Sequence, residues 1–202
     1  MSPGRMPPVT QALLIANVAV FALQYLSGPL LISSFALWPL GSDQFAGAPS
    51  FRPWQLLTYG FLHAGPAHLF FNMLALYMFG GDIERLLGAR RFLVYYLLCV
   101  IGAAVTQVIV MGNIDRPPVP TVGASGGVFG LLLAFGMAFP QRRIILLFPP
   151  IPMPAWLFVI VYAGIELYLG VTGTQAGVAH FAHLGGMLGG FIMLQYWRRP
   201  RF

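Results

Sequence analysis

One serine and two histidines are the residues of this chain best suited to covalent chemistry. Ser125 lies in Gly123-Ala124-Ser125-Gly126-Gly127 at the start of an apolar run, while His68 and His183 lie in two other apolar runs. A serine hydroxyl attacks a carbonyl at neutral pH only when a neighbouring base takes its proton. The pattern therefore indicates a nucleophile and a base assembled from separate helices. Taken alone, Ser125 is more typical of a close contact between membrane helices, where small residues gather.

A second polar pair, His68 and Asn72, could stabilise negative charge near that serine. The two residues are four positions apart and so share one helix face, from which both donate hydrogen bonds. Gly123 and Gly126 are secondary candidates beside them, since glycine permits close approach of a backbone. The alternative is that the pair only joins two helices. His63, just before this helix, is expected to be structural or exposed.

The choice of base lies between His180 and His183, which are one helical turn apart. We favour His183 as the general base, because Gly186 continues its face as a groove that another helix can approach. His180 is a secondary candidate. A His-x-x-His pair can bind a metal, but no carboxylate accompanies this one in its run, so we expect no metal and no cofactor.

No carboxylate is expected to complete a catalytic triad. Asp82 and Glu84 fall at the far end of the apolar run that holds His68. Glu166 lies in the same outer half of its span as the candidate residues, yet a role for it as third member is judged unlikely. The sequence therefore favours a Ser125–His183 dyad, in which tight packing has to hold the imidazole.

The composition places the chain in a lipid bilayer. Charged residues make up 8% of it, hydrophobic residues 58%, and the mean hydropathy is +0.78. A soluble domain carries about 25% charged residues. The net charge of +6 does not indicate nucleic-acid binding, because all the basic residues are arginines scattered between apolar runs. The single cysteine, Cys99, excludes an intramolecular disulfide.

The apolar runs predict a single all-α membrane domain over residues 1–202. Six spans of about 20 residues are expected, at residues 9–27, 66–81, 92–111, 123–139, 153–171 and 177–197. The segment 28–65 contains several tryptophans and phenylalanines, which favours a structure lying at the membrane interface. The first span is interpreted as a retained anchor rather than a signal peptide.

The arginines predict how the spans are oriented. With the N-terminus in the cytoplasm, nine of the eleven arginines lie inside, and only Arg52 and Arg116 lie outside. The reverse orientation would break the positive-inside rule. Both termini are therefore expected to be cytoplasmic. Spans two, four and six then run inward, which places His68, Ser125 and His183 together in the outer part of the bilayer.

These residues resemble the rhomboid family of intramembrane serine proteases, in its compact six-span form. The matching pieces are His68-x-x-x-Asn72, Gly123-x-Ser125-Gly126 and Ala179-x-x-x-His183-x-x-Gly186, with Gly80-Gly81-Asp82-Ile83-Glu84-Arg85 after the second span. The resemblance implies a six-helix bundle with a cavity open to the outside. It also implies an endopeptidase that cleaves transmembrane segments of single-span proteins near the outer face, in the inner membrane of a bacterium, without a metal or cofactor.

Two residues depart from the family pattern. Many relatives have adjacent Trp-Arg in the first loop, where this chain has Trp54-Gln55, and Phe129 stands where some relatives have a tyrosine beside the catalytic histidine. Apolar packing on His183 is expected to survive the second change. The alternatives are a catalytically silent relative that binds client helices, a haem- or metal-carrying bundle, and, least favoured, a channel or transporter. The oligomeric state and the substrate are left open.

Overall fold

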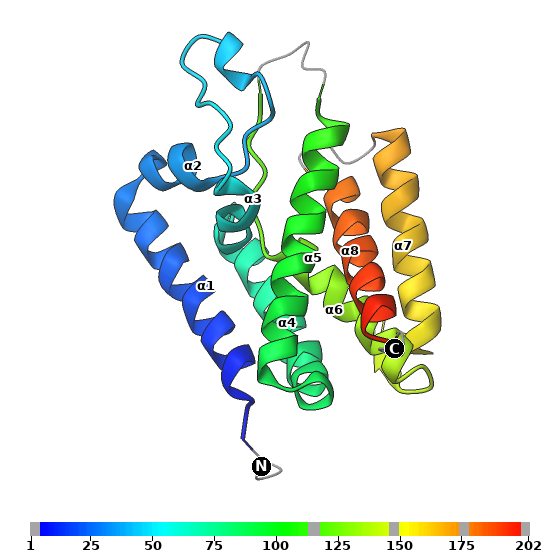
Figure 1. The fold of residues 1–202 in the computed structure, drawn as a ribbon. Coiled ribbons are helices and arrows are strands. Elements are labelled where there is room, and N and C mark those ends of the chain that lie inside the picture. Colours follow the sequence, from blue (N-terminus) through cyan, green and yellow to red (C-terminus); the bar gives the residue numbers. More distant parts are fainter. Residues whose placement is uncertain (1–4, 113–117, 146–149, 174–177, 199–202) are drawn as a thin grey trace.

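The computed structural model describes residues 5–112, 118–145, 150–173 and 178–198 of the chain. The described part is a bundle of long helices (Figure 1), namely α1 (Pro8–Ser27), α4 (Pro66–Leu87), α5 (Ala89–Val110), α6 (Ser125–Ala138), α7 (Ala155–Thr172) and α8 (His180–Arg198). Shorter elements connect them, namely α2 (Pro29–Phe35), η1 (Ser42–Gln44), α3 (Gln55–Thr58), η2 (Tyr59–Phe61), β1 (Arg143–Ile145) and β2 (Pro152–Pro154).

Each apolar run of the sequence forms one long helix, and the ends differ from the expected ones by a few residues. Helix α4 continues to Leu87, six residues beyond its apolar run, and stops at Gly88, whose φ of 79° ends it. Helix α6 begins at Ser125 rather than at residue 123. Helix α8 begins at His180, and the start expected at residue 177 lies outside the described residues.

The outside of the bundle is apolar, as expected for a membrane protein. Among the described helices α1, α5 and α7 are long and apolar enough to cross a bilayer, and α6 is apolar but shorter, with 14 residues. Large apolar side chains point away from the bundle, including Leu26, Ile109 and Val171, which are 81%, 73% and 72% exposed. A soluble monomer rarely exposes contiguous apolar surface of this kind.

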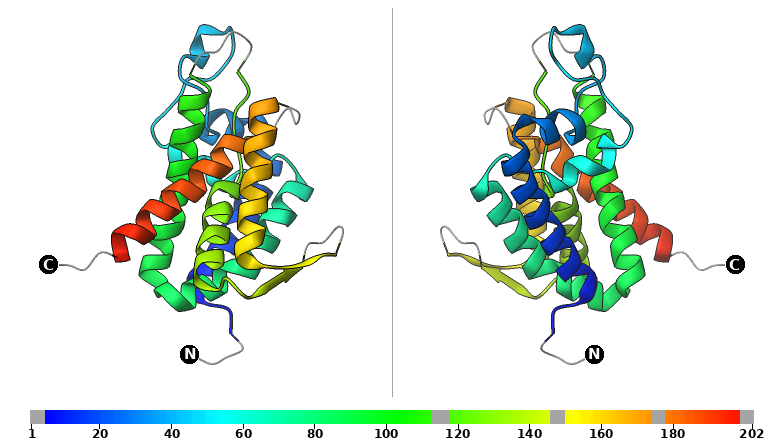
Figure 2. Two further views of the ribbon diagram at one scale, coloured as in Figure 1. Left: turned by 90° about the vertical axis from the view of Figure 1, so that its right-hand side faces the viewer. Right: turned by 90° about the vertical axis from the view of Figure 1, so that its left-hand side faces the viewer.

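Helices α5, α6 and α8 form the centre of the bundle, with α1 at one side and α7 at the other (Figures 1 and 2). The buried carboxylate of Glu84 attaches α1 to α4. Its Oε1 accepts the Val9 N–H at 2.9 Å, and its Oε2 accepts the N–H and hydroxyl of Thr10 at 2.6 and 2.8 Å. Glu84 thereby satisfies donors at the start of α1 that no residue within that helix can accept.

The loop over residues 28–65 is ordered by a buried amide. Gln55 is fully buried, and its Oε1 accepts the N–H groups of Arg52 at 3.1 Å and Trp38 at 3.3 Å. The loop lies at one end of the bundle, and the start of α1 lies at the other (Figure 1). A short antiparallel hairpin of β1 and β2, absent from the sequence-based prediction, joins α6 to α7 and projects from the bundle (Figure 2).

Candidate active site

Ser125 is the first residue of α6, where a tight turn leads into the helix. Gly123 in this turn has a φ of 130°, and its N–H donates to the Tyr59 carbonyl at 3.0 Å. Such a φ disfavours any residue with a Cβ. A Cβ at Gly123 would also lie 2.9 Å from Nε2 of His68 and 3.6 Å from Oγ of Ser125. The glycine therefore allows the His68 ring to lie close to the serine.

His183 lies in the first turn of α8 and meets Ser125 directly. Its Nε2 is 2.8 Å from the Ser125 Oγ. Helices α6 and α8 approach each other closely here. A Cβ on Gly186 would overlap the carbonyl oxygen of Gly126 on α6, so the approach requires a glycine at this position. His183 is the fourth residue of α8, which begins at His180.

Glu166 on α7 lies behind the His183 ring, contrary to the expectation that no carboxylate is placed to form a triad. Its Oε2 is 2.9 Å from His183 Nδ1, and the residue is only 8% exposed. Helix α7 is apolar over most of its surface, so its sequence does not specify which face packs inward. The sequence signal that could have placed Glu166 in the site was its charge, because an ionisable residue within a membrane helix usually belongs to a functional site.

These contacts determine which nitrogen of His183 carries the proton. A carboxylate only accepts hydrogen bonds, so the Glu166 contact assigns the proton to Nδ1. The Nε2 of a neutral imidazole is then an acceptor, and it is the atom that faces the Ser125 hydroxyl. The hydroxyl can therefore donate its proton to His183, which is the arrangement that a general base requires.

His180 binds the same carboxylate without reaching the serine. Its Nδ1 is 2.7 Å from Oε2 of Glu166, and its ring centroid is 6.4 Å from that of His183. The His180 side chain is 5% exposed, and its Nε2 has no hydrogen-bond partner among the described residues. The expectation of no metal depended on the lack of a carboxylate near this pair, and Glu166 supplies one from the neighbouring helix.

The polar pair on α4 makes its hydrogen bonds with backbone groups and leaves one ring nitrogen of His68 beside Gly123. The side-chain amide of Asn72 donates to the His68 carbonyl at 2.9 Å, across one helical turn. The Nδ1 of His68 accepts the Ala64 N–H at 3.3 Å, which assigns the proton of the neutral ring to Nε2, the atom that lies near Gly123. His68 therefore has a donor aimed toward the space beside Ser125.

The comparisons with known proteins agree with this geometry. A family model for the rhomboid domain matches residues 50–200. The chain belongs to the rhomboid family. The family match begins within the first loop, so α1 lies outside it, although α1 packs against α4 through Glu84.

Curated rhomboid relatives match the chain at moderate identity. The chain is 34% identical over 140 residues to rhomboid protease GluP of Bacillus subtilis, covering 69% of this chain and 25% of the relative. It is 25% identical over 194 residues to rhomboid protease GlpG of Yersinia pestis, covering 94% of this chain and 62% of the relative. The chain thus spans from a quarter to under two thirds of the length of these relatives.

The two departures from the rhomboid pattern have local explanations. Phe129 stacks on the His183 ring with 4.3 Å between centroids and 6° between planes, so apolar packing on the imidazole is retained without a tyrosine. In the first loop, Gln55 replaces an arginine and holds the loop through its buried amide. The adjacent Trp54 donates its Nε1–H to the Ser34 carbonyl at 3.0 Å.

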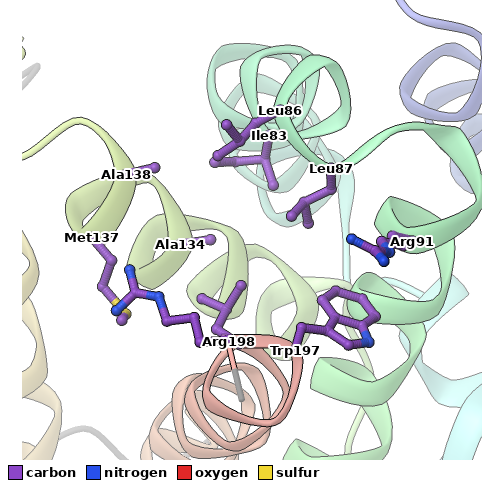
Figure 3. Close-up of a pocket in the computed structure, with 10 residues that line it drawn as sticks. Ile83, Leu86, Leu87, Arg91, Ala134, Met137, Ala138, Trp197 and Arg198 are labelled. Atoms are coloured by element: carbon purple, nitrogen blue, oxygen red, sulfur yellow. The ribbon is translucent and has the colours of Figure 1, made fainter. Parts of the chain in front are cut away.

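A cavity of about 180 Å³ lies far from this rhomboid site, between the C-terminal ends of α4, α6 and α8 and the start of α5 (Figure 3). Its walls are mostly apolar, with Arg91, Trp197 and Arg198 at the edge. None of the residues around Ser125 lines it. The cavity therefore does not bind the group on which the serine would act.

Proposed function

We propose that this rhomboid chain is a serine endopeptidase that cleaves transmembrane segments of single-span membrane proteins near the outer face of the membrane. The observation that carries the proposal is the 2.8 Å contact between Ser125 Oγ and His183 Nε2 inside an apolar bundle. The printed names of the relatives, rhomboid proteases GluP and GlpG, support the same reaction class. A catalytically silent binder would have no need of this contact.

In this proposal Ser125 is the nucleophile and His183 the general base. His183 Nε2 takes the hydroxyl proton as Oγ bonds to the carbonyl carbon of the scissile peptide. The resulting imidazolium donates the proton to the leaving amine when the C–N bond breaks. Water then hydrolyses the acyl-enzyme with the same base. Glu166 holds the ring in the required tautomer and stabilises its positive charge.

The oxyanion of the tetrahedral intermediate would be stabilised by donors beside Ser125. His68 Nε2–H and Asn72 are the side-chain candidates, and the backbone N–H groups of the first turn of α6 have no acceptor within the helix. The positive end of the α6 dipole adds to this effect. Gly123 leaves the space that the His68 ring needs, whereas the space at Gly126 is taken by Ala103 of the neighbouring α5.

The substrate must offer an extended backbone at the serine, whereas a membrane helix hides its backbone groups in its own hydrogen bonds. We therefore expect substrates with small or helix-weakening residues near the outer membrane face. We also propose that six helices cross the inner membrane of a bacterium with both termini in the cytoplasm. The arginines at the end of α4, the start of α5 and just after α6 support that orientation, namely Arg85, Arg90, Arg91 and Arg142.

The proposal is tested by reconstituting the purified chain in liposomes with a single-span substrate. The parent is expected to release two fragments. Ser125→Ala is expected to fold normally and release none, since it removes one hydroxyl from a site of small residues. Binding of the substrate by a parent protein that does not cleave it would favour the silent binder instead.

A further inference from the structure

Three buried side chains from two helices converge on one point beside the proposed catalytic histidine. Glu166, His180 and His183 each offer one ligand atom, and these atoms lie within 4.8 Å of one another. Both histidines direct Nδ1 toward the same carboxylate oxygen, at 2.7 and 2.9 Å. Catalysis by Ser125 and His183 requires only one of these two imidazoles.

The charge at this point is not balanced by a permanent cation. The ion-pair partners recorded for Glu166 among the described residues are His180 and His183, which carry charge only when protonated. Burying a carboxylate is costly unless it is paired. With both histidines neutral, the site has one negative charge and an electrostatic preference for a cation.

We propose that Glu166, His180 and His183 bind a first-row divalent cation of the zinc type, and that the bound cation inhibits the enzyme. Two histidines and one glutamate are a known ligand set for zinc with one coordination position left open. Imidazole and carboxylate donors suit zinc, cobalt and copper better than calcium or magnesium. The inhibitory half of the inference rests on the proposed function, but the binding half does not.

To accept the ion, the carboxylate oxygen and the two histidine nitrogens, which lie within 4.8 Å of one another, have to adopt tetrahedral spacing. Zinc bonds nitrogen and oxygen at about 2.0–2.2 Å, so neighbouring ligands in a tetrahedron are about 3.3 Å apart. The two contacts to Glu166 Oε2 therefore lengthen by about half an ångström as the ion takes the place of the shared hydrogen bonds.

Inhibition follows from the atom that the cation uses. A metal on His183 Nδ1 needs the lone pair there, so the proton of the neutral ring moves to Nε2. Nε2 then donates and can no longer accept the Ser125 proton. Nδ1 of His183 thus carries a proton in the active enzyme and a metal in the inhibited one.

Binding is tested directly with cobalt, whose visible absorption reports a tetrahedral N/O site without any enzymatic assay. Purified Ser125→Ala protein, which keeps all three ligands, is expected to bind one Co²⁺. Glu166→Gln and His180→Gln in that background are expected to weaken binding about tenfold or more, because even losing a contact behind a ligand costs about 10–100-fold. His63→Gln removes a different buried histidine and is the matched control, with unchanged binding expected.

Zinc inhibition is tested with the parent, His180→Gln and His63→Gln, each measured against its own metal-free rate in a chelator. Zinc is expected to inhibit the parent and His63→Gln equally and reversibly, and His180→Gln only at concentrations about tenfold higher or more. In Ser125→Ala, zinc is also expected to raise the melting temperature, because a ligand that binds only the folded state stabilises it.

Equal cobalt affinity of the Ser125→Ala protein with and without His180→Gln would overturn the inference, and so would the absence of cobalt binding to both. Equal zinc sensitivity of His180→Gln and the parent would overturn its inhibitory half. Cobalt binding by a protein that never cleaves a substrate would leave the metal site in place and reject the proposed function, so the two failures can be told apart.

Discussion

Glu166 is the residue that most changes the chemistry expected of this site. A Ser–His dyad depends on packing alone to hold its imidazole, whereas here a buried carboxylate accepts the Nδ1–H of His183 at 2.9 Å. The stacked Phe129 ring fixes the plane of the imidazole from the other direction. The ring is therefore held in one tautomer and one orientation before any substrate binds.

This contact predicts a large effect of a small substitution. Glu166→Gln preserves size but removes the charge that stabilises the imidazolium, so turnover is expected to fall by up to about 10⁴-fold, as in a triad whose orienting acid is amidated. The Michaelis constant is expected to change little, because Glu166 does not touch the substrate. The measurement is cleavage in liposomes, with a melting curve as control; a parental turnover rate would exclude the positioning role.

The α4 pair predicts a second, smaller effect. His68→Ala and Asn72→Ala are each expected to raise the barrier to cleavage by about 2.7–4 kcal/mol, the range for losing one oxyanion donor. Because Asn72 also binds the His68 carbonyl, the double variant is expected to lose less than the sum of the two. Full additivity, or parental rates in folded single variants, would show that the pair only joins helices.

At the scale of elements, the crossing of α6 and α8 brings the serine and the histidine together. A Cβ on Gly186 would overlap the Gly126 carbonyl. Gly186→Ala is therefore expected to destabilise the fold by about 1–3 kcal/mol, the usual cost of overpacking, and to separate His183 from Ser125. Gly164→Ala is the matched control, since no atom lies within 4 Å of a Cβ there; thermal unfolding in detergent compares the two. Equal stability would contradict the crossing.

The long helices could be predicted from the sequence because each needs only an apolar run of sufficient length. Which faces of those helices meet could not, as Glu166 shows, because lipid and protein interior are equally apolar and leave no periodic signal along α7. The small-residue motifs were the exception: Gly126 and Gly186 indicated a close crossing and form one. The hairpin of β1 and β2 was missed, since its three-residue strands contain two prolines.

At the scale of the whole molecule, the two ends of the bundle differ in chemistry. The end near the start of α1 carries Arg85, Arg91 and Arg142, and Arg85 and Arg142 both pair with Asp82. The loop over residues 28–65 lies at the opposite end, and Ser125 and His183 lie in the first turns of α6 and α8, at the ends of these helices that face toward that loop (Figure 1). This separation agrees with the arginine pattern of the sequence, whereas the orientation in the membrane stays a prediction.

His63, outside the long helices, predicts how stability depends on pH. It is fully buried without a hydrogen-bond partner for either ring nitrogen among the described residues, and burial lowers its pKa from 6.5 to about 4. The unfolded chain therefore binds a proton at His63 that the folded protein does not bind. The contribution of His63 to the free energy of unfolding is greatest above pH 6.5 and is lost as the pH falls toward 4. The expected loss approaches about 3 kcal/mol, at about 1.4 kcal/mol per pKa unit.

Unfolding of the parent and of His63→Gln in detergent, compared between pH 7 and pH 4, measures this contribution. The difference between the two proteins cancels the titration of the other groups. The His63→Gln curve is expected to be flatter over this interval. Parallel curves would show that His63 is protonated in the folded protein, contrary to its burial.

Labelling with a fluorophosphonate tests the central claim most directly, because the probe reacts only with a serine whose hydroxyl is activated by a base. In the presence of a chelator, the parent is expected to be labelled at Ser125, as located by peptide mapping, and Ser125→Ala is expected to remain unlabelled. His183→Ala is expected to lose labelling, whereas His180→Ala keeps an appreciable part, since only His183 reaches the Ser125 Oγ. Labelling of Ser125→Ala, or labelling that depends on His180 and not on His183, would contradict the account.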